Sequence, residues 1–378
     1  MFVVTAAIHG NEPAGTRALC NVLQQLRQRQ IPIRGAMLGL LGNVGALARG
    51  DRYVSHDLNR GWLPATIDRY FAREDPVDPA SLRDEDLERY ELSCLYRRLF
   101  AQSSKSVFFL DLHSTSADGP PFCAIADTLR CRKIAFSLPL PVILGLEENV
   151  DGTMLSYVNE LGHTSLVVEG GQHDDPRTVQ NHEAAIWLTL VACRAVKKKH
   201  VPDLAGHLAR LRRAAAGIPH VLETRYRHPV SQEDQFRMLP GFINFQEITR
   251  GQMLATDQTG NIHSRQNGRI LMPLYQNQGE DGFFVIRTIR RFWLVLSHML
   301  RRLRLHVLLP LLPGVSWHPA MHDTLLVNPR LARFQVVQIF HLFGFRRMTP
   351  EGRCFVFTRR RPDFRKLASD GLMASDPA

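Results

Sequence analysis

Short apolar runs alternate with longer amphipathic stretches through the first half of the chain. Residues 2–8 (FVVTAAI) form a β-branched apolar run that is too short for a helix, which predicts a buried strand. The next stretch places four hydrophobic residues on one face of a helix: Leu19, Val22, Leu23 and Leu26. Further strands are predicted at residues 36–43, 107–113, 140–145 and 165–171, and a helix through roughly 176–198. Apolar strands that alternate with helices predict an α/β fold with a mainly parallel sheet flanked by helices.

The pattern changes after about residue 205. A basic helix (LAGHLARLRRAAAG) precedes short alternating runs separated by glycines, which predicts a β-rich unit at about 218–287. An Arg-rich segment with apolar helix faces follows, and the chain ends in a polar tail. We therefore expect an α/β domain at 1–205, a β-rich subdomain at 206–290 and a basic C-terminal extension at 291–378.

The positive charge is concentrated in that extension. Residues 287–378 hold sixteen Arg and Lys against five Asp and Glu, whereas the rest of the chain holds thirty-one of each. A basic amphipathic segment is typical of proteins that dock on anionic lipid or nucleic acid. The alternative is a small appended domain whose arginines are solvated or paired with an acidic surface. Arg301, Arg302 and Arg304 interrupt the apolar run, which excludes a membrane-spanning helix there.

The cysteines and the N-terminus indicate the compartment. Six cysteines are scattered without a CxxC pair, which argues against a disulfide framework or a thiolate zinc site and favours a reducing compartment. The first residues, MFVVTAAIHGNEP, lack the basic region of a signal peptide and reach polar positions quickly. We therefore expect a cytoplasmic protein.

Two histidines and a carboxylate follow predicted strands. His9 and Glu12 lie in HGNEPAG directly after the first strand, and Pro13 suits the first turn of a helix. His113 closes a later strand in DLHST, so two strand ends can supply two histidines and one carboxylate to one catalytic zinc ion. Asp111 is a candidate to orient a ligand imidazole. Taken alone, the HxxE spacing is common, and His113 could be an ordinary strand-end histidine.

Other polar residues fall at equivalent places. Arg52, Asn59 and Arg60 lie in RYVSHDLNR, and Glu169 ends a third apolar strand in VVEGG. Considered singly, Asn59 and Arg60 would be a loop cap and a solvated guanidinium, and Glu169 would be a paired strand-end carboxylate. Open α/β sheets bind their ligands at the carboxyl ends of the strands. Four separate segments that all reach this edge therefore predict one shared crevice.

The motifs HGNEPAG, DLNR, DLHST and VVEGG, in that order, resemble those of the succinylglutamate desuccinylase/aspartoacylase family over roughly residues 1–290. The resemblance implies the architecture of zinc carboxypeptidases, with the zinc hydrolase catalytic domain at 1–205, one zinc ion per chain, and a C-terminal β-domain that helps to shape the pocket. It implies the following roles: zinc ligation by His9, Glu12 and His113; polarisation of the scissile carbonyl by Arg52; substrate carboxylate binding by Asn59 and Arg60; and general-base catalysis by Glu169. Tyr157 and Tyr275 are loose candidates for completing the pocket.

These roles imply a zinc-dependent deacylase that hydrolyses the amide of an N-acyl amino acid or a similar small carboxylate-bearing amide. A zinc carboxypeptidase that acts on a peptide is the close alternative. The second alternative is a non-catalytic protein that binds its partner through the basic extension. Homo-oligomerisation is possible in either case. The sequence has no GxSxG, HExxH or P-loop motif, which argues against a serine hydrolase, an HExxH protease and a nucleotide-binding P-loop enzyme.

Overall fold

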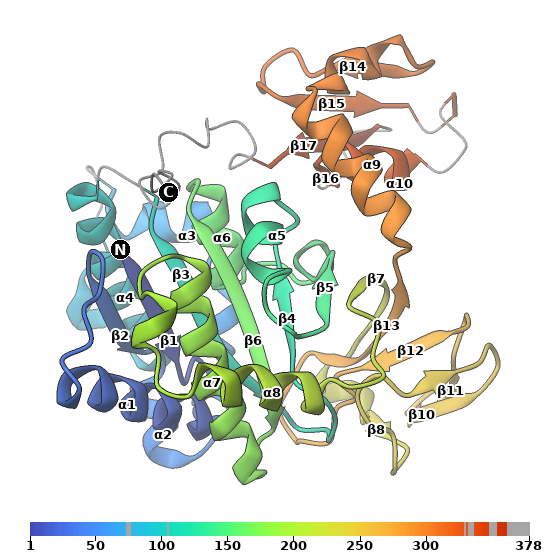
Figure 1. The fold of residues 1–378 in the computed structure, drawn as a ribbon. Helices are drawn as coiled ribbons and strands as arrows, with labels where there is room; N and C mark the ends of the chain where they lie inside the picture. The colour runs from blue at the N-terminus through green and yellow to red at the C-terminus, as the bar shows by residue number, and fades with distance from the viewer. Residues whose placement is uncertain (73–76, 104–105, 329, 332–335, 348–353, 361–378) are drawn as a thin grey trace.

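The protein consists of a large central sheet with helices on both faces, a small second sheet, and a C-terminal module (Figure 1). The computed structural model describes residues 1–378 apart from 73–76, 104–105, 329, 332–335, 348–353 and 361–378. The predicted polar tail falls largely outside the described residues. Within the described residues, no helix is long and apolar enough to cross a membrane.

The central sheet has ten strands in the order β2-β1-β3-β6-β4-β5-β7-β13-β12-β9. Their bounds are β1 Phe2–Ala6, β2 Met37–Leu41, β3 Phe108–Thr115, β4 Phe122–Ile125, β5 Val142–Leu144, β6 Thr164–Gln172, β7 Val221–Pro229, β9 Glu247–Ile248, β12 Gly268–Leu271 and β13 Asp281–Thr288. Strands β2, β1, β3 and β6 are parallel, while β4 runs antiparallel to β6. The predicted fold class, a mainly parallel mixed sheet flanked by helices, is confirmed.

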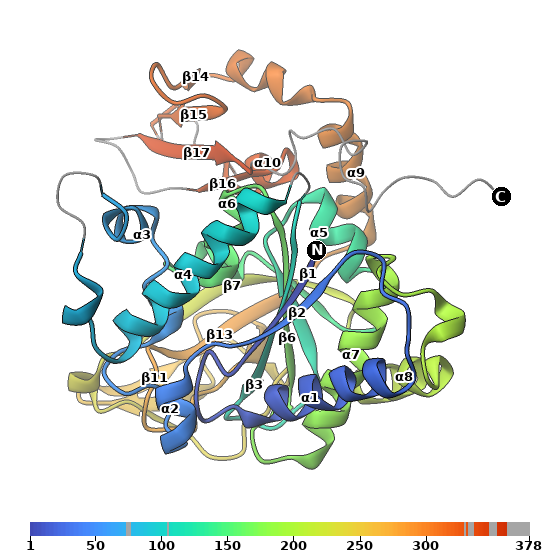
Figure 2. The same ribbon diagram turned by 90° about the vertical axis from the view of Figure 1, so that its left-hand side faces the viewer.

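Helices cover both faces of this sheet, as Figure 2 shows from the side. On one face lie α1 Pro13–Gln28, α5 Leu129–Ala135, α7 Pro176–Ala192 and α8 Leu204–Ala214. On the other lie α3 Pro64–Arg69, α4 Asp84–Gln102 and α6 Met154–Glu160. Successive side chains of a strand enter opposite cores: Val4 packs with the first set of helices and Val3 with the second.

Helix α7 is shorter than predicted. It ends at Ala192 rather than near residue 198. Arg194 has a φ of 56°, in the left-handed region that an α-helix cannot contain. The apolar residues Ala195 and Val196 are buried all the same, because the chain folds back against the core after the turn. Because Ala195 and Val196 are hydrophobic, the sequence pattern predicted a helix that continued past its actual end at Ala192.

Strands from the predicted β-rich region extend the central sheet. Strand β7 pairs in parallel with β5, and β13, β12 and β9 continue the sheet from it. The separate three-stranded sheet consists of β8 Arg237–Met238, β10 Met253–Asp257 and β11 Gly260–His263. The domain boundaries at 205 and 290 stay a prediction.

The C-terminal module begins with α9 Arg291–Arg302 and η6 Leu305–Leu311, and it also contains α10 Val336–Leu342. Its sheet has the order β14-β15-β17-β16, with β14 Val315–Trp317, β15 Thr324–Val327, β16 Phe345–Arg347 and β17 Phe355–Arg359. Buried ion pairs connect it to the α/β domain: Arg301 pairs with Asp127 at 2.6 Å, and Arg360 pairs with Glu147 at 2.8 Å and with Glu148. Part of the extension's positive charge is therefore neutralised by acidic groups of the main body.

The remaining short elements are α2 Val44–Arg49, η1 Leu58–Arg60, η2 Pro79–Ser81, η3 Leu146–Glu148, η4 Lys198–His200 and η5 Gln232–Asp234. Of these, η1 and η3 lie beside the candidate active site, because Asn59, Arg60 and Leu146 line a cavity there.

Candidate active site

The candidate residues lie at the carboxyl edge of the central sheet. Strands β1, β3 and β6 are parallel neighbours, with Ala6 opposite Leu112 and His113 opposite Glu169. His9 follows β1, while His113 and Glu169 lie within β3 and β6. Three adjacent strands therefore bring these side chains to the edge where open α/β sheets bind ligands.

The turn between β1 and α1 places His9 beside Glu12. Gly10 packs so closely on α2 that a Cβ would lie 2.1 Å from the carbonyl carbon of Ala46, so only glycine fits there. The backbone N–H of Glu12 donates to the carbonyl of His9 at 3.2 Å. Pro13 occupies the first turn of α1, where an N–H is not needed. The HGNEP sequence thus forces the two candidate ligands together.

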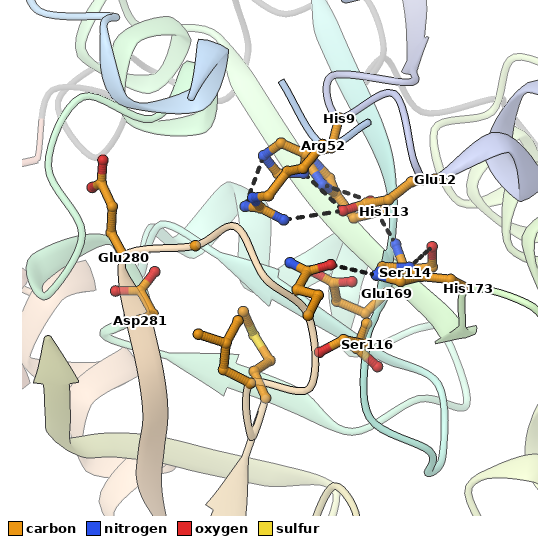
Figure 3. Close-up of a pocket in the computed structure, with 15 residues that line it drawn as sticks. His9, Glu12, Arg52, His113, Ser114, Ser116, Glu169, His173, Glu280 and Asp281 are labelled. Carbon is orange, nitrogen blue, oxygen red and sulfur yellow. Dashed lines mark hydrogen bonds and ion pairs between the residues drawn. The ribbon is translucent and has the colours of Figure 1, made fainter. Parts of the chain in front are cut away.

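His9, Glu12 and His113 form a buried group that could hold a metal ion (Figure 3). His9 Nδ1 lies 2.8 Å from Glu12 Oε1, and His113 Nδ1 lies 3.2 Å from Glu12 Oε2. One donor atom from each residue lies within 4.8 Å of the others, and all three residues are at most 4% exposed. Two imidazoles and a carboxylate are a donor set that suits a catalytic divalent transition metal.

Two aspartates orient the imidazoles. His113 Nε2 lies 2.8 Å from Asp111 Oδ2, and His9 Nε2 lies 3.2 Å from Asp57 Oδ1. Both rings therefore direct Nδ1 toward Glu12 and Nε2 toward a carboxylate, which is the arrangement usual for metal-binding histidines. Asp111 was a sequence candidate for this role, whereas Asp57 was not, although it lies in the RYVSHDLNR motif.

Charges within this group shift the pKa values of its members. Burial opposes ionisation of Glu12, but His9 and His113 outweigh it and hold the pKa of Glu12 well below its usual range. Burial disfavours protonation of His113, but Asp111 and Glu12 outweigh it and raise its pKa. The cluster thus concentrates negative charge around two imidazoles, which favours a bound cation in place of their protons.

Arg52 reaches the same cluster from the loop after α2. Its Nη2 donates to Asp57 Oδ2 at 3.0 Å, and its Nη1 lies 3.5 Å from Glu12 Oε1. Its Nε is buried and has no hydrogen-bond partner among the described residues. The guanidinium is thus held in place by two carboxylates and keeps one N–H donor for a substrate oxygen.

Glu85 of α4 holds the loop that carries Arg52. Its carboxylate accepts hydrogen bonds from the backbone N–H groups of Val54 at 2.6 Å and Ser55 at 2.9 Å, and from the side chain of Asn43 at 2.9 Å. Burial opposes ionisation of Glu85, but these hydrogen bonds outweigh it and lower its pKa to about 2. Glu85 has no signal in the local sequence, because its contacts lie far away in the chain.

Asn59 and Arg60 line the cavity beside the metal-ligand group. Asn59 Oδ1 accepts from the backbone N–H of Met154 at 2.9 Å, so its amide NH₂ is the end left for a ligand. Arg60 Nη2 donates to Asp281 Oδ2 at 2.7 Å, and its Nε lies 3.4 Å from Glu280 Oε2. Arg60 is therefore not an isolated cation, and a substrate carboxylate would join acidic groups already present.

Glu169 is a buried carboxyl group that faces the metal-ligand cluster. It is 8% exposed, and its Oε2 has no hydrogen-bond partner among the described residues. Burial raises its pKa to about 8, against the opposing effect of His113 and Arg52. A bound cation nearby would lower that value again, and a pKa near neutrality suits a group that accepts and returns protons.

Two cavities meet at these residues. One has a volume of about 470 Å³ and is lined by polar groups such as Ser114, Ser116, His173, Gln276 and Glu280. The other has a volume of about 670 Å³ and has mainly apolar walls. They share a junction formed by His9, Arg52, His113, Glu169, Met272 and Asp281. Together they contain all seven predicted site residues.

The loosely predicted tyrosines lie elsewhere. The hydroxyl of Tyr275 donates to the carbonyl of Leu239 at 2.6 Å and accepts from the N–H of Phe242 at 2.9 Å. Tyr157 packs against Trp62 in the core between the central sheet and helices α3, α4 and α6. Neither residue lines the two cavities.

Comparison with known families agrees with this geometry. The sequence model of the succinylglutamate desuccinylase/aspartoacylase catalytic domain matches residues 1–193. The chain belongs to the succinylglutamate desuccinylase/aspartoacylase family. The matched region contains all seven predicted site residues, from His9 to Glu169.

Two curated members of the family match this chain over short stretches. Succinylglutamate desuccinylase of Yersinia pestis (strain Pestoides F) is 43% identical over 58 residues, which is 15% of this chain and 18% of that protein. Succinylglutamate desuccinylase of Pseudomonas fluorescens (strain SBW25) is 30% identical over 113 residues, 30% of each chain. The chain thus matches less than a third of the length of these relatives.

Solved structures share the fold over most of the chain. Succinylglutamate desuccinylase of Vibrio cholerae has a TM-score of 0.52 at 17% identity, covering 84% of this chain and 83% of its own. The product-bound ectoine utilization protein EutE (DoeB) of Ruegeria pomeroyi has a TM-score of 0.53 at 17% identity, covering 76% and 85%. These likenesses extend the common architecture beyond the matched catalytic domain.

Proposed function

We propose that this protein is a zinc-dependent amidohydrolase that removes the acyl group from an N-acyl amino acid or a similar small carboxylate-bearing amide. One observation carries the proposal. Three buried donors, His9, Glu12 and His113, face one another where two cavities meet. His9 and His113 line both cavities together with Glu169 and Arg52, and Glu12 lines the smaller one. A purely structural metal site has no need of a buried carboxyl group and a guanidinium beside it.

The donor set supports zinc as the metal. His9, Glu12 and His113 would hold the ion, each imidazole being oriented by an aspartate, and three protein ligands are the number usual for a catalytic zinc ion. A zinc ion bound there would supply Lewis acidity, which acidifies water and polarises an amide carbonyl.

The chain's own residues would divide the remaining work. Glu169 would accept a proton from the attacking water and return it to the leaving nitrogen, since its Oε2 has no competing partner among the described residues. Arg52 would donate its Nε–H to the carbonyl oxygen as negative charge develops there. Asn59 and Arg60 would bind the substrate carboxylate from the wall of the larger cavity.

A substrate panel tests the proposal. Purified protein loaded with zinc is incubated with N-acyl amino acids, and the released amine is measured. We expect release from at least one member of the panel, loss of release on treatment with a chelator, and its return on adding zinc. A metal-loaded protein that releases no amine from any member would contradict the proposed function and favour a binding role.

A further inference from the structure

The two cavities that meet at the catalytic junction differ in chemistry. The larger one extends away from His113 and Glu169 between β4, β6, η3 and α6. Its walls are aliphatic along most of their length: Ala124, Ile125, Leu146, Val150, Leu155 and Val167. Asn59 and Arg60 stand at its side, so a carboxylate bound by them would direct its neighbouring substituent into this apolar space.

The guanidinium groups near the larger cavity are already paired with carboxylates of the chain. Arg60 and Arg227 share the carboxylate of Asp281, at 2.7 Å and 2.5 Å, and Arg60 Nε also lies 3.4 Å from Glu280 Oε2, so these cations leave no surplus positive charge for a second substrate carboxylate. Arg52 is compensated by Asp57 and Glu12.

Among the described residues, the far end of the cavity offers no unpaired cation to a second carboxylate. Glu147, the one ionisable group on the wall away from the junction and from Arg60, is itself paired with Arg360 at 2.8 Å. A second carboxylate placed among the aliphatic side chains would lose its hydration without gaining a cation.

We propose that the larger cavity holds an apolar side chain, so that the substrate is an N-acyl derivative of an aliphatic or aromatic amino acid with a single carboxylate. This inference rests on the proposed function. It departs from the doubly charged acidic amino acids, whose second carboxylate the aliphatic walls exclude. The acyl group then occupies the polar cavity, near Ser116 and Gln276.

Turnover of three N-acetyl amino acids, derived from leucine, alanine and aspartate, tests this inference. We expect kcat/KM to fall in that order, with the leucine derivative at least about tenfold above the aspartate derivative. The reason is that the cavity walls bury an apolar side chain favourably and desolvate a carboxylate. Ala124→Leu narrows the cavity. It is expected to lower kcat/KM for the leucine derivative about tenfold and to leave the alanine derivative within about twofold.

The matched control is Ala205→Leu, at an exposed position of α8, which should change neither value. If the wild type hydrolyses N-acetylaspartate as efficiently as the leucine derivative, this inference is overturned and the proposed function stands. That outcome does not depend on whether the Ala124→Leu variant folds. Equal losses for leucine and alanine in a folded Ala124→Leu protein would also overturn it. If the protein hydrolyses none of the three derivatives and no other member of the substrate panel, both this inference and the proposed function are overturned.

A second and independent observation concerns α9, whose polar side faces inward. Ser297 and Arg301 are 1% and 4% exposed, and they bind the carbonyl of Leu342 at 2.8 Å and Asp127 at 2.6 Å. The opposite side is apolar and faces solvent: Phe292 is 65%, Met299 52% and Leu303 63% exposed. These positions recur at helical spacing, so they form one exposed stripe along α9.

Further exposed apolar residues follow in η6, and arginines lie near both elements in the sequence. Val307, Leu308 and Leu311 are exposed, the last to 80%. Residues 287–328 contain six arginines and one acidic residue, Asp323. Five of the six are exposed and form no ion pair with a described residue: Arg287, Arg290, Arg291, Arg302 and Arg304. We call this surface, residues 290–311, the α9–η6 face.

We propose that the α9–η6 face docks on a membrane surface that contains anionic lipid. Aromatic and aliphatic side chains beside arginines are the composition of helices that lie in the lipid interface. A second copy of this chain would bring the same unpaired arginines against one another across a two-fold axis, which is repulsive. A nucleic acid would neutralise the arginines but would leave Met299, Leu303 and Leu311 exposed to water.

Sedimentation of the full chain with vesicles tests the proposal. We expect binding to vesicles of phosphatidylcholine with phosphatidylglycerol and much weaker binding to phosphatidylcholine alone. Binding should decrease as salt rises, because the arginines contribute through screened attraction. The double variant Met299→Gln with Leu303→Gln should weaken it at least about tenfold, since two apolar side chains leave the interface.

The matched control replaces two exposed leucines elsewhere, Leu23→Gln with Leu161→Gln, and should bind as the wild type does. Equal vesicle binding by both double variants would overturn the proposal. Absence of vesicle binding at low salt would also overturn it. In that case RNA binding would indicate a nucleic-acid partner, and dimers abolished by Met299→Gln with Leu303→Gln would indicate a second copy of the chain.

Discussion

Replacing Glu169 with glutamine is expected to lower kcat by about 10²- to 10⁴-fold while metal content and fold are retained. Glutamine has the same shape but cannot accept the proton that the attacking water must lose. Glu169 lies outside the three-donor group, so the metal ligands stay in place. The change also places a neutral amide where burial already raises the pKa of the carboxyl group to about 8, so it should not destabilise the fold. Turnover, bound metal and the melting temperature are measured on one preparation.

The matched control is Glu91→Gln, at an exposed position of α4, which should leave turnover unchanged. A Glu169→Gln enzyme with near-normal kcat would show that another group accepts the proton. A large loss of metal in this variant would instead indicate that Glu169 supports the ligand cluster.

The α/β framework could be predicted because its strands are apolar on both faces. Strands β1, β3 and β6 are fully or almost fully buried, so each contains consecutive apolar residues (FVV, FFL and LVV) rather than an alternation of apolar and polar ones. Helix α4 was missed for the opposite reason. It buries Glu85, Arg89 and Ser93 along with its apolar residues, so hydrophobicity does not follow a helical period.

The candidate ligands could be predicted because each follows a strand that the hydrophobic pattern locates. Their supporting partners could not, because those contacts join distant positions. Asp57 lies 48 residues from His9, and Asp281 lies 221 residues from Arg60 in a different part of the sheet. No local spacing relates such residues. The apolar lining of the larger cavity likewise reads in the sequence as ordinary core, and only the open space beside it marks it as a binding surface.

Replacing His113 with alanine is expected to weaken metal binding by more than about 100-fold. Removing a group that only orients a ligand typically costs about 10- to 100-fold, so Asp111→Asn should fall within that range and His113→Ala beyond it. The order follows from the geometry: His113 Nδ1 faces Glu12, whereas Asp111 reaches the site only through His113 Nε2. Competitive titration with a chromogenic chelator measures the affinities.

Thermal unfolding gives a second measure of the same loss. Zinc at 100 times its dissociation constant would stabilise the wild type by about 2.7 kcal/mol, and this gain should fall below about 0.4 kcal/mol in His113→Ala at the same zinc concentration. His263→Ala, at an exposed histidine of β11, is the matched control and should keep both affinity and stabilisation. If His113→Ala binds zinc as tightly as His263→Ala does, the ligand assignment is wrong. If Asp111→Asn loses as much affinity as His113→Ala, the carboxylate of Asp111 contributes more than the orientation of the ring, since orientation alone leaves the donor atom in place.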